Sequence, residues 1–288
     1  MTVPPATTIP ARGVSERRAV SISGAPADAM TGSWGIAVEA PVEIALNGVS
    51  WTVMLATPAD LDDLAIGLAL TERVLRDART VERVERSEYL SDISVNLVVP
   101  EAQLDRAALR ARSLVGGSAC GLCGLESLAQ LHARSGRALP GDDAQTLGTP
   151  PAVSDEAVMS AFAALPMHQP INRETHSVHA AAWCDLHGAI ALVREDVGRH
   201  NALDKLIGAL ARQDRLTEPG FIVMSSRASY ELVYKATAAS TALLATLSAP
   251  TTMALEWAAA LGLPLACRAG GGAQAGVVHF PVAGAHAG

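Results

Sequence analysis

The sequence predicts an α/β protein in which helices cover the faces of a largely parallel sheet. In the second half of the chain, short apolar runs alternate with amphipathic helical stretches, and this order favours parallel strands joined by helices. Hydrophobic residues make up 49% of the 288 residues but aromatic residues only 3%. Val, Leu, Ile and Ala must therefore fill the core, which suits helices packed closely on a sheet. The first half has strand and helix signals without this regular alternation, so we expect an N-terminal α+β subdomain there.

The N-terminal elements follow from turn and capping signals. Residues 1–33 are rich in Pro, Ala, Thr, Ser and Gly, and we expect them to be a disordered tail. Next, AVEAPVEIALNGVSWTVML alternates apolar and polar residues around Asn47-Gly48, which predicts a β-hairpin. Thr57 is expected to cap a helix with Pro58 at its first position. That helix would run through LDDLAIGLALTERVL and bury one face.

The remaining segments complete the predicted domain organisation. A strand at SDISVNLVV and a charged helix around LDRAALRAR complete the subdomain, which spans residues 34–115. Residues 116–152 are expected to hold a glycine-flanked loop, a helix and a linker rich in Pro, Gly and Asp. Residues 153–288 form the predicted α/β domain, whose first helix starts at Ser154.

Three polar loops of the α/β domain each follow a predicted strand. They read REDVGRH, SSRAS and CRAGGG, after the strands AIALV, FIVMS and LPLAC. Ligands of such sheets sit at the carboxyl ends of the strands, so we expect the three loops to form one binding edge. Arg side chains and clustered backbone N–H groups match phosphate oxygens, which predicts a phosphorylated ligand. For the first loop, the alternative is a solvated turn with Asp196 or Asn201 as a helix cap.

Charge and hydropathy argue against several classes of protein. The 22 Lys and Arg residues and 29 Asp and Glu residues give a net charge of −7, so a nucleic-acid binder held by bulk charge is not expected. No run reaches the ~18–20 apolar residues of a membrane span. The segment after Arg17-Arg18 is too polar for an export signal. We therefore expect a cytoplasmic protein.

Two of the four cysteines, Cys120 and Cys123, form a CxxC pair within GGSACGLCG. A helix is expected to begin just after Cys123, and a helix N-terminus favours a thiolate over a thiol. A thiolate is the nucleophile that accepts a sulfur atom or opens a disulfide, so the pair indicates sulfur chemistry. The alternatives are half of a zinc site, a redox pair and two incidental thiols. The sequence lacks the H-x-E and P-C-x-x-C motifs of a zinc deaminase, which excludes that enzyme class.

Four motifs of the chain resemble those of the FdhD family, the formate dehydrogenase accessory sulfurtransferases. In chain order they read GSACGLCG, REDVGRHNALDKLIG, SSRASYELVYKA and LSAPTTMALEWAAALGLPLACRAGG. The upstream segment, with VEAPVEIALNG and TPADLDDLAIGLALTERVL, is similar to the N-terminal part of the same family. The resemblance covers about residues 36–281.

This resemblance implies a sulfur carrier that acts as a sulfurtransferase. Cys120 would take sulfur from a cysteine desulfurase as a persulfide, and Cys123 would tune or release it. The sulfur would pass to the molybdenum bis(molybdopterin guanine dinucleotide) cofactor, bound as a substrate, before the cofactor enters formate dehydrogenase. The resemblance further implies a cytoplasmic homodimer that binds guanine nucleotides, with GDP as a fragment of the cofactor. No resident metal and no zinc are expected.

The same resemblance implies the fold and the cofactor contacts. The α/β domain would be a three-layer sandwich like that of cytidine deaminase, without the zinc site. The expected cofactor-binding residues lie in the three loops and are Gly198, Arg199, His200, Asn201, Ser225, Arg227, Ala266, Cys267, Arg268, Ala269, Gly270 and Gly271. The last loop lacks the leading aromatic residue and the final Arg that family members often have at this turn.

The residues alone are also compatible with two other functions. In the first, the chain is a non-enzymatic chaperone that escorts the cofactor or the apo-enzyme, and its CxxC is structural or redox-active. In the second, weaker one, the chain is a zinc-bound structural protein. Sulfur carried on Cys120 would separate a carrier from an escort.

Overall fold

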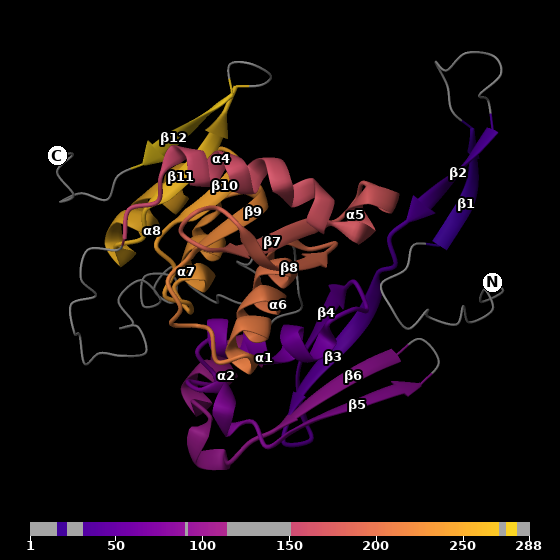
Figure 1. The fold of residues 1–288 in the computed structure, drawn as a ribbon. Coiled ribbons are helices and arrows are strands. Elements are labelled where there is room, and N and C mark those ends of the chain that lie inside the picture. Colours follow the sequence, from indigo (N-terminus) through magenta and orange to yellow (C-terminus); the bar gives the residue numbers. More distant parts are fainter. Residues whose placement is uncertain (1–15, 22–30, 90–91, 114–150, 271–274, 281–288) are drawn as a thin grey trace.

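The computed structural model describes residues 16–21, 31–89, 92–113, 151–270 and 275–280. These residues form an α/β fold with two main sheets and a separate two-stranded sheet (Figure 1). The four-stranded sheet has the strand order β4-β3-β6-β5, and the six-stranded sheet has the order β12-β11-β10-β9-β7-β8. The predicted α/β fold class is confirmed.

The four-stranded sheet belongs to the N-terminal half of the chain. Its strands are β3 (Ala40–Leu46), β4 (Val49–Ala56), β5 (Arg83–Tyr89) and β6 (Asp92–Val98). The predicted hairpin turn is present, because Asn47 and Gly48 have positive φ angles of 50° and 78° and join β3 to β4. The sequence does not predict β5, because its residues RVERSEY are mostly charged, as is common for an edge strand.

The segment predicted to be a disordered tail contains two strands. β1 (Glu16–Ser21) pairs in an antiparallel manner with β2 (Thr31–Ile36), and Trp34 of β2 lies with its ring centroid 5.4 Å from that of His176. The two strands pair through backbone hydrogen bonds, which do not depend on side-chain composition. A segment rich in Pro, Ser and Gly can therefore form strands that its composition does not predict. The division of the whole chain into domains stays a prediction.

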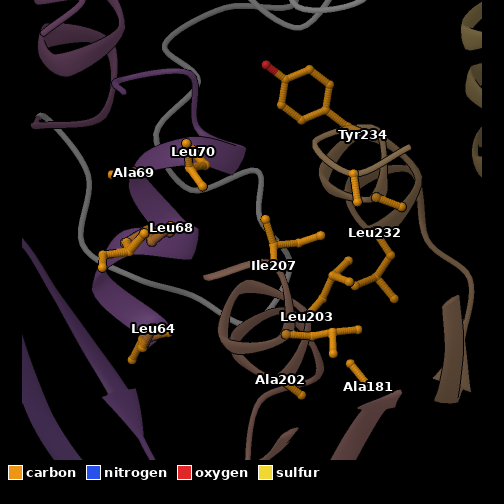
Figure 2. Packing of buried hydrophobic residues seen from close by; sticks show 14 of the residues in the cluster. Leu64, Leu68, Ala69, Leu70, Ala181, Ala202, Leu203, Ile207, Leu232 and Tyr234 are labelled. Carbon is orange, nitrogen blue, oxygen red and sulfur yellow. The ribbon is translucent and has the colours of Figure 1, made fainter. Parts of the chain in front are cut away.

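Helix α1 (Leu61–Thr71) differs in two ways from the predicted helix. It begins after Asp60 instead of at Thr57, and it ends at Thr71. It is also buried on nearly every side instead of on one face, because it lies between the four-stranded sheet and helix α6 (Arg199–Arg212). In Figure 2, Leu64 and Leu68 of α1 and Leu203 and Ile207 of α6 lie on opposite sides of the place where the two helices meet.

Two glycines allow α1 and α6 to cross at backbone distance. A Cβ atom added to Gly67 would lie 1.7 Å from the carbonyl oxygen of Asp204, and one added to Gly208 would lie 1.9 Å from that of Asp63. Real Cβ atoms do not approach backbone atoms so closely. The helices therefore touch through their main chains at this crossing.

The six-stranded sheet is mixed, which corrects the prediction of a largely parallel sheet. Its strands are β7 (His179–Cys184), β8 (Ile190–Asp196), β9 (Phe221–Arg227), β10 (Leu244–Ser248), β11 (Leu265–Ala269) and β12 (Gly276–Phe280). Strands β8 to β11 run in one direction, and β7 is antiparallel to both β8 and β9. The short turn between β7 and β8 makes them a hairpin, and β12 folds back antiparallel onto β11.

Helices cover both faces of this sheet. The helices of the described residues, besides α1 and α6, are α2 (Arg106–Ser113), α4 (Asp155–Ala164), α5 (Pro170–Thr175), α7 (Tyr230–Ala236) and α8 (Thr252–Leu261). The predicted cap of α4 is confirmed, since the Ser154 hydroxyl accepts a hydrogen bond from the N–H of Ala157. Helices α6, α7 and α8 share a core with one face of the sheet, and α4 packs on the other (Figure 1). None of the described helices is long and apolar enough to cross a membrane.

A buried charged cluster joins α1, α6 and α7. The Lys235 ammonium donates to both carboxylate oxygens of Asp204 at 2.9 Å, to Glu72 Oε1 at 3.0 Å and to Thr71 Oγ1 at 3.0 Å. All four side chains are buried. Burial raises the pKa of Asp204, and the nearby Lys235 charge opposes this rise. One buried cation thus forms ion pairs with two buried carboxylates.

Candidate functional site

The three predicted loops lie at the same edge of the six-stranded sheet. Strands β8, β9 and β11 run in the same direction, so their carboxyl ends meet at one edge, as the sequence predicts. Two strand spacings separate β8 from β9, and four separate β8 from β11. At ~4.8 Å per spacing, the first and third loops lie about 19 Å apart. The edge therefore suits a long ligand, or separate parts of one.

Arg194 and Glu195, at the start of the first loop, contact helices on opposite sides of the six-stranded sheet. Arg194 Nε lies 2.8 Å from Asp63 Oδ2 of α1. The next residue, Glu195, points the other way, and its carboxylate accepts hydrogen bonds from the N–H groups of Ile171 and Asn172 at the start of α5. Burial raises the pKa of Glu195, and these backbone hydrogen bonds oppose the rise. These two residues stabilise the fold around the loop.

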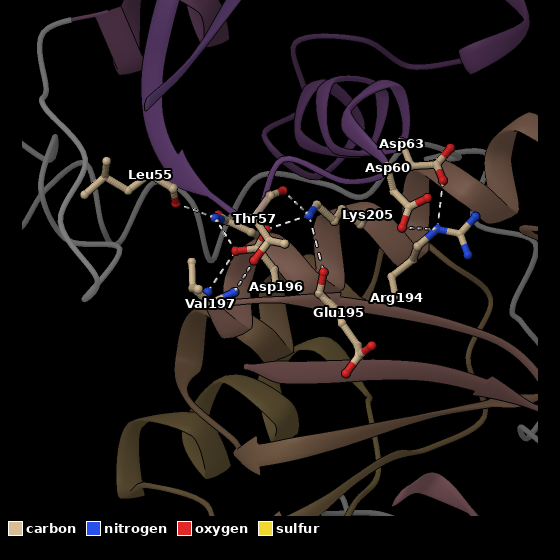
Figure 3. A network of polar contacts seen from close by, with 11 residues as sticks. Leu55, Thr57, Asp60, Asp63, Arg194, Glu195, Asp196, Val197 and Lys205 are labelled. Carbon is tan, nitrogen blue, oxygen red and sulfur yellow. Dashed lines mark hydrogen bonds and ion pairs between the residues drawn. The ribbon is translucent and has the colours of Figure 1, made fainter. Parts of the chain in front are cut away.

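Asp196 and Lys205 form a buried ion pair behind the loop, at 2.6 Å (Figure 3). Neither side chain is exposed to solvent. Asp196 Oδ1 also accepts the N–H of Gly198 at 2.8 Å, and Lys205 Nζ donates to the carbonyl oxygen of Thr57 at 2.9 Å. The pair therefore fixes the turn that leads into α6. Asp196 is therefore neither solvated nor a helix cap, because it is fully buried and Gly198 is the N-cap of α6, which has no side-chain cap hydrogen bond.

Asn201 was expected to contact the cofactor, but its side chain has interior partners. Its Nδ2 donates to the carbonyl oxygen of Leu55 and to Asp196 Oδ1, both at 2.9 Å, and the residue is 5% exposed. A ligand could engage this amide only by replacing those bonds. The geometry favours a structural role for Asn201, because its polar group completes the β8–α6 turn.

The residues that remain at the edge come from the beginning of α6 and of α7. Gly198 is the N-cap of α6 and Arg199 its first residue. His200 Nε2 lies 2.9 Å from Glu231 Oε2 and 3.5 Å from Ser229 Oγ. Burial raises the pKa of Glu231, but the hydrogen bond and charge of His200 together bring it below its usual value.

Sequence reasoning missed Glu231. Its position as an acidic residue in the first turn of a helix after SSRAS is the signal that was available. The pairing with His200 joins the first loop to the second, because the two residues belong to α6 and α7. The two loops thus form one polar cluster.

His179, at the first position of β7, lies beside this cluster. Its Nδ1 is 3.4 Å from Ser225 Oγ, and that hydroxyl accepts the N–H of Ala180 at 2.8 Å. Burial lowers the pKa of His179 from 6.5, and the charges of Arg199 and His200 lower it further. The pKa of His179 therefore depends on the charges of the two residues that begin α6.

The second and third loops present two exposed arginines, Arg227 and Arg268. Ala266 and Cys267, also expected to bind the cofactor, are buried in β11, and burial raises the pKa of Cys267. This corrects the predicted extent of the third loop, whose accessible part begins only at Arg268, because β11 buries the two residues before it. Ala269 and Gly270 follow it at the end of β11.

Three predicted site residues, Cys120, Cys123 and Gly271, lie outside the described residues, as do the helix and linker expected after the CxxC pair. In the part of the chain that is described, no three His, Cys, Asp or Glu side chains are arranged to hold a metal ion.

Comparisons with known proteins agree with the motifs. The FdhD/NarQ family model matches residues 37–276. Sulfur carrier protein FdhD of Variovorax paradoxus is 46% identical over 231 residues, which is 80% of each chain. The protein of the same name from Chromobacterium violaceum is 42% identical over 235 residues, 81% of this chain and 85% of that one.

A solved structure shares the fold. The crystal structure of a formate dehydrogenase accessory protein from Desulfotalea psychrophila matches 94% of this chain and 97% of its own, with a TM-score of 0.64 and 18% identity. The family match and the identity to curated relatives cover most of the chain. The chain belongs to the FdhD/NarQ family.

Proposed function

We propose that this protein is a sulfur carrier that serves formate dehydrogenase. The observation that carries the proposal is the 46% identity to a sulfur carrier protein over 80% of the chain, together with the CxxC pair in GSACGLCG. In the proposed reaction, the Cys120 thiolate attacks the outer sulfur of a cysteine desulfurase persulfide. The desulfurase thiolate leaves, and Cys120 keeps the sulfur as its own persulfide.

The proposed acceptor is the molybdenum bis(molybdopterin guanine dinucleotide) cofactor, before its insertion into formate dehydrogenase. Its phosphates suit the cationic edge, where Arg199 and His200 lie near one end and Arg268 near the other. Charge-assisted hydrogen bonds to phosphate oxygens are the strong contacts that such side chains make. The negative net charge of the protein does not oppose this, because only the site needs to be positive. Cytoplasmic location and a homodimer belong to the same proposal.

The first test measures sulfur on the protein. After incubation with a cysteine desulfurase and cysteine, intact mass should increase by one sulfur atom, and reduction should remove it. Cys120→Ala should abolish the gain, and Cys123→Ala should reduce it less. Cys184→Ala is the control and should load normally, because burial raises the pKa of this thiol to about 12 and keeps it protonated.

A chaperone without carrier function gives a different result in the same experiment. It would show no added sulfur, while formate dehydrogenase activity would still depend on the protein. That result would replace the sulfurtransferase proposal with the escort role. Full loading of Cys120→Ala would instead show that another residue carries the sulfur and would reject the assignment to Cys120.

The second test uses His179 to detect an anion at the edge. By NMR titration, His179 should have a pKa below 6.5, since burial, Arg199 and His200 all disfavour its protonation. Its folded-state pKa is depressed, so its share of stability is present above pH 6.5 and is lost as pH falls. GDP should raise the His179 pKa, because its phosphates offset the neighbouring positive charge.

The control for this titration is His187, an exposed residue in the turn after β7, at the other edge of the sheet. Its ring signals should not change when GDP is added. If GDP leaves the His179 pKa unchanged at saturating concentration, the nucleotide portion does not bind at this edge.

A further inference from the structure

Thr57 contacts the β8–α6 turn through three of its atoms. Its N–H donates to Asp196 Oδ2 at 3.0 Å, its carbonyl oxygen accepts from Lys205 Nζ at 2.9 Å, and its Oγ1 accepts the N–H of Val197 at 3.1 Å. Thr57 is fully buried, and it lies between β4 and α1, in the N-terminal half of the chain. Figure 3 shows Thr57 facing Asp196, Val197 and Lys205.

The Asp196 carboxylate transmits this contact to the binding edge. One oxygen, Oδ2, is used by Thr57 and Lys205. The other, Oδ1, is used by the N–H of Gly198 and by Asn201 Nδ2. The same rigid group therefore holds Thr57 on one side and the residue before Arg199 on the other.

The contact is not a helix cap. A capping side chain accepts N–H groups of the first helical turn, whereas Asp196 accepts the N–H of Gly198, which precedes that turn. The additional bonds place two buried charges against the main chain of Thr57, 139 positions away from Asp196. Buried charges are costly unless they are fully paired, so this arrangement holds the turn in one position.

We infer that Thr57 is a positioning residue for Arg199 and His200, through which the N-terminal half sets the affinity of the edge for phosphorylated ligands. Loss of its hydroxyl leaves the Val197 N–H without its acceptor, so that the turn loosens and the first turn of α6 samples other positions. This inference rests on the proposed nucleotide site but concerns a fully buried residue behind it.

The experiment compares three variants by two measurements. Thr57→Val removes the hydroxyl with little change of shape, and Thr57→Ser keeps it. Thr241→Val is the matched control, because the Thr241 hydroxyl also accepts a backbone N–H at 3.1 Å, from Ile222 at the start of β9 and the opposite edge of the sheet. Hydrogen exchange reports the mobility of residues 197–200, and calorimetry reports the affinity for GDP.

Thr57→Val should accelerate exchange at residues 197–200 by about tenfold and weaken GDP binding by about five- to tenfold, the size expected for one lost buried acceptor. Thr57→Ser should restore both values, and Thr241→Val should change neither. Unchanged exchange in Thr57→Val, or faster exchange with unchanged GDP affinity, would overturn the positioning role. If the wild-type protein itself fails to bind GDP, the proposed nucleotide site is wrong, and the exchange data alone then decide whether Thr57 holds the turn.

Discussion

Gly208→Ala should lower the free energy of unfolding by at least about 3 kcal/mol, because overpacking a rigid contact forces backbone movement. The new methyl group would lie 1.9 Å from the carbonyl oxygen of Asp63 and 2.8 Å from the amide nitrogen of Gly67. Both are main-chain atoms of α1, so no side chain can move aside. The helices would have to separate, which disturbs the apolar cluster to which both of them contribute (Figure 2). Urea denaturation gives the measurement.

Gly276→Ala is the matched control, since a Cβ at that position meets nothing within 4 Å. Its unfolding free energy should stay within about 0.5 kcal/mol of the wild-type value. Gly67→Ala should behave like Gly208→Ala, because its methyl would meet the Asp204 carbonyl oxygen. A wild-type midpoint for both helix variants would show that α1 and α6 do not touch through their main chains.

Lys235→Met should lower the free energy of unfolding by about 3–5 kcal/mol, because the carboxylates of Asp204 and Glu72 lose their buried cation. Methionine matches the length of the lysine stem, so the loss comes mainly from charge. The penalty should shrink as pH falls. Burial already raises the pKa of Asp204, and removal of Lys235 raises it further, so acid supplies the protons that neutralise the group.

Arg79→Met is the control for this charge removal. Arg79 pairs with Asp77 on the surface at 2.8 Å, and exposed pairs of this kind contribute little to stability. Its urea midpoint should match that of the wild type. A Lys235→Met variant with that same midpoint at neutral pH would mean that Asp204 and Glu72 do not depend on this cation for their burial.

Local sequence signals predicted those parts of the fold that neighbouring residues decide. Asn47-Gly48 forms the predicted hairpin turn, and Ser154 caps α4. The alternation of strands and helices also predicted that the three loops lie at the same edge of the sheet. The antiparallel position of β7 was missed, because a two-residue periodicity shows that a segment is a strand but not in which direction its neighbour runs.

Long-range contacts explain what the sequence could not predict about the site. Thr57 has the residue type and spacing of a helix cap, yet its hydroxyl accepts a hydrogen bond from a residue 140 positions later. Asn201 lies in the densest polar motif of the chain, but its partner Leu55 belongs to the other half. Polar residues in a loop motif can serve a ligand or the fold. Only the three-dimensional arrangement separates Arg199 and His200 from Asn201.

The crossing of α1 and α6 means that neither half of the chain has a complete core of its own. The buried cluster that contains Leu64 and Leu68 of α1 also contains Leu203 and Ile207 of α6, and it continues into both main sheets. A gene that encoded only the α/β domain would yield a chain with this apolar surface of α6 open to water. Surfaces of that kind drive self-association. The α/β domain produced alone should therefore self-associate, even where its own sheet stays intact.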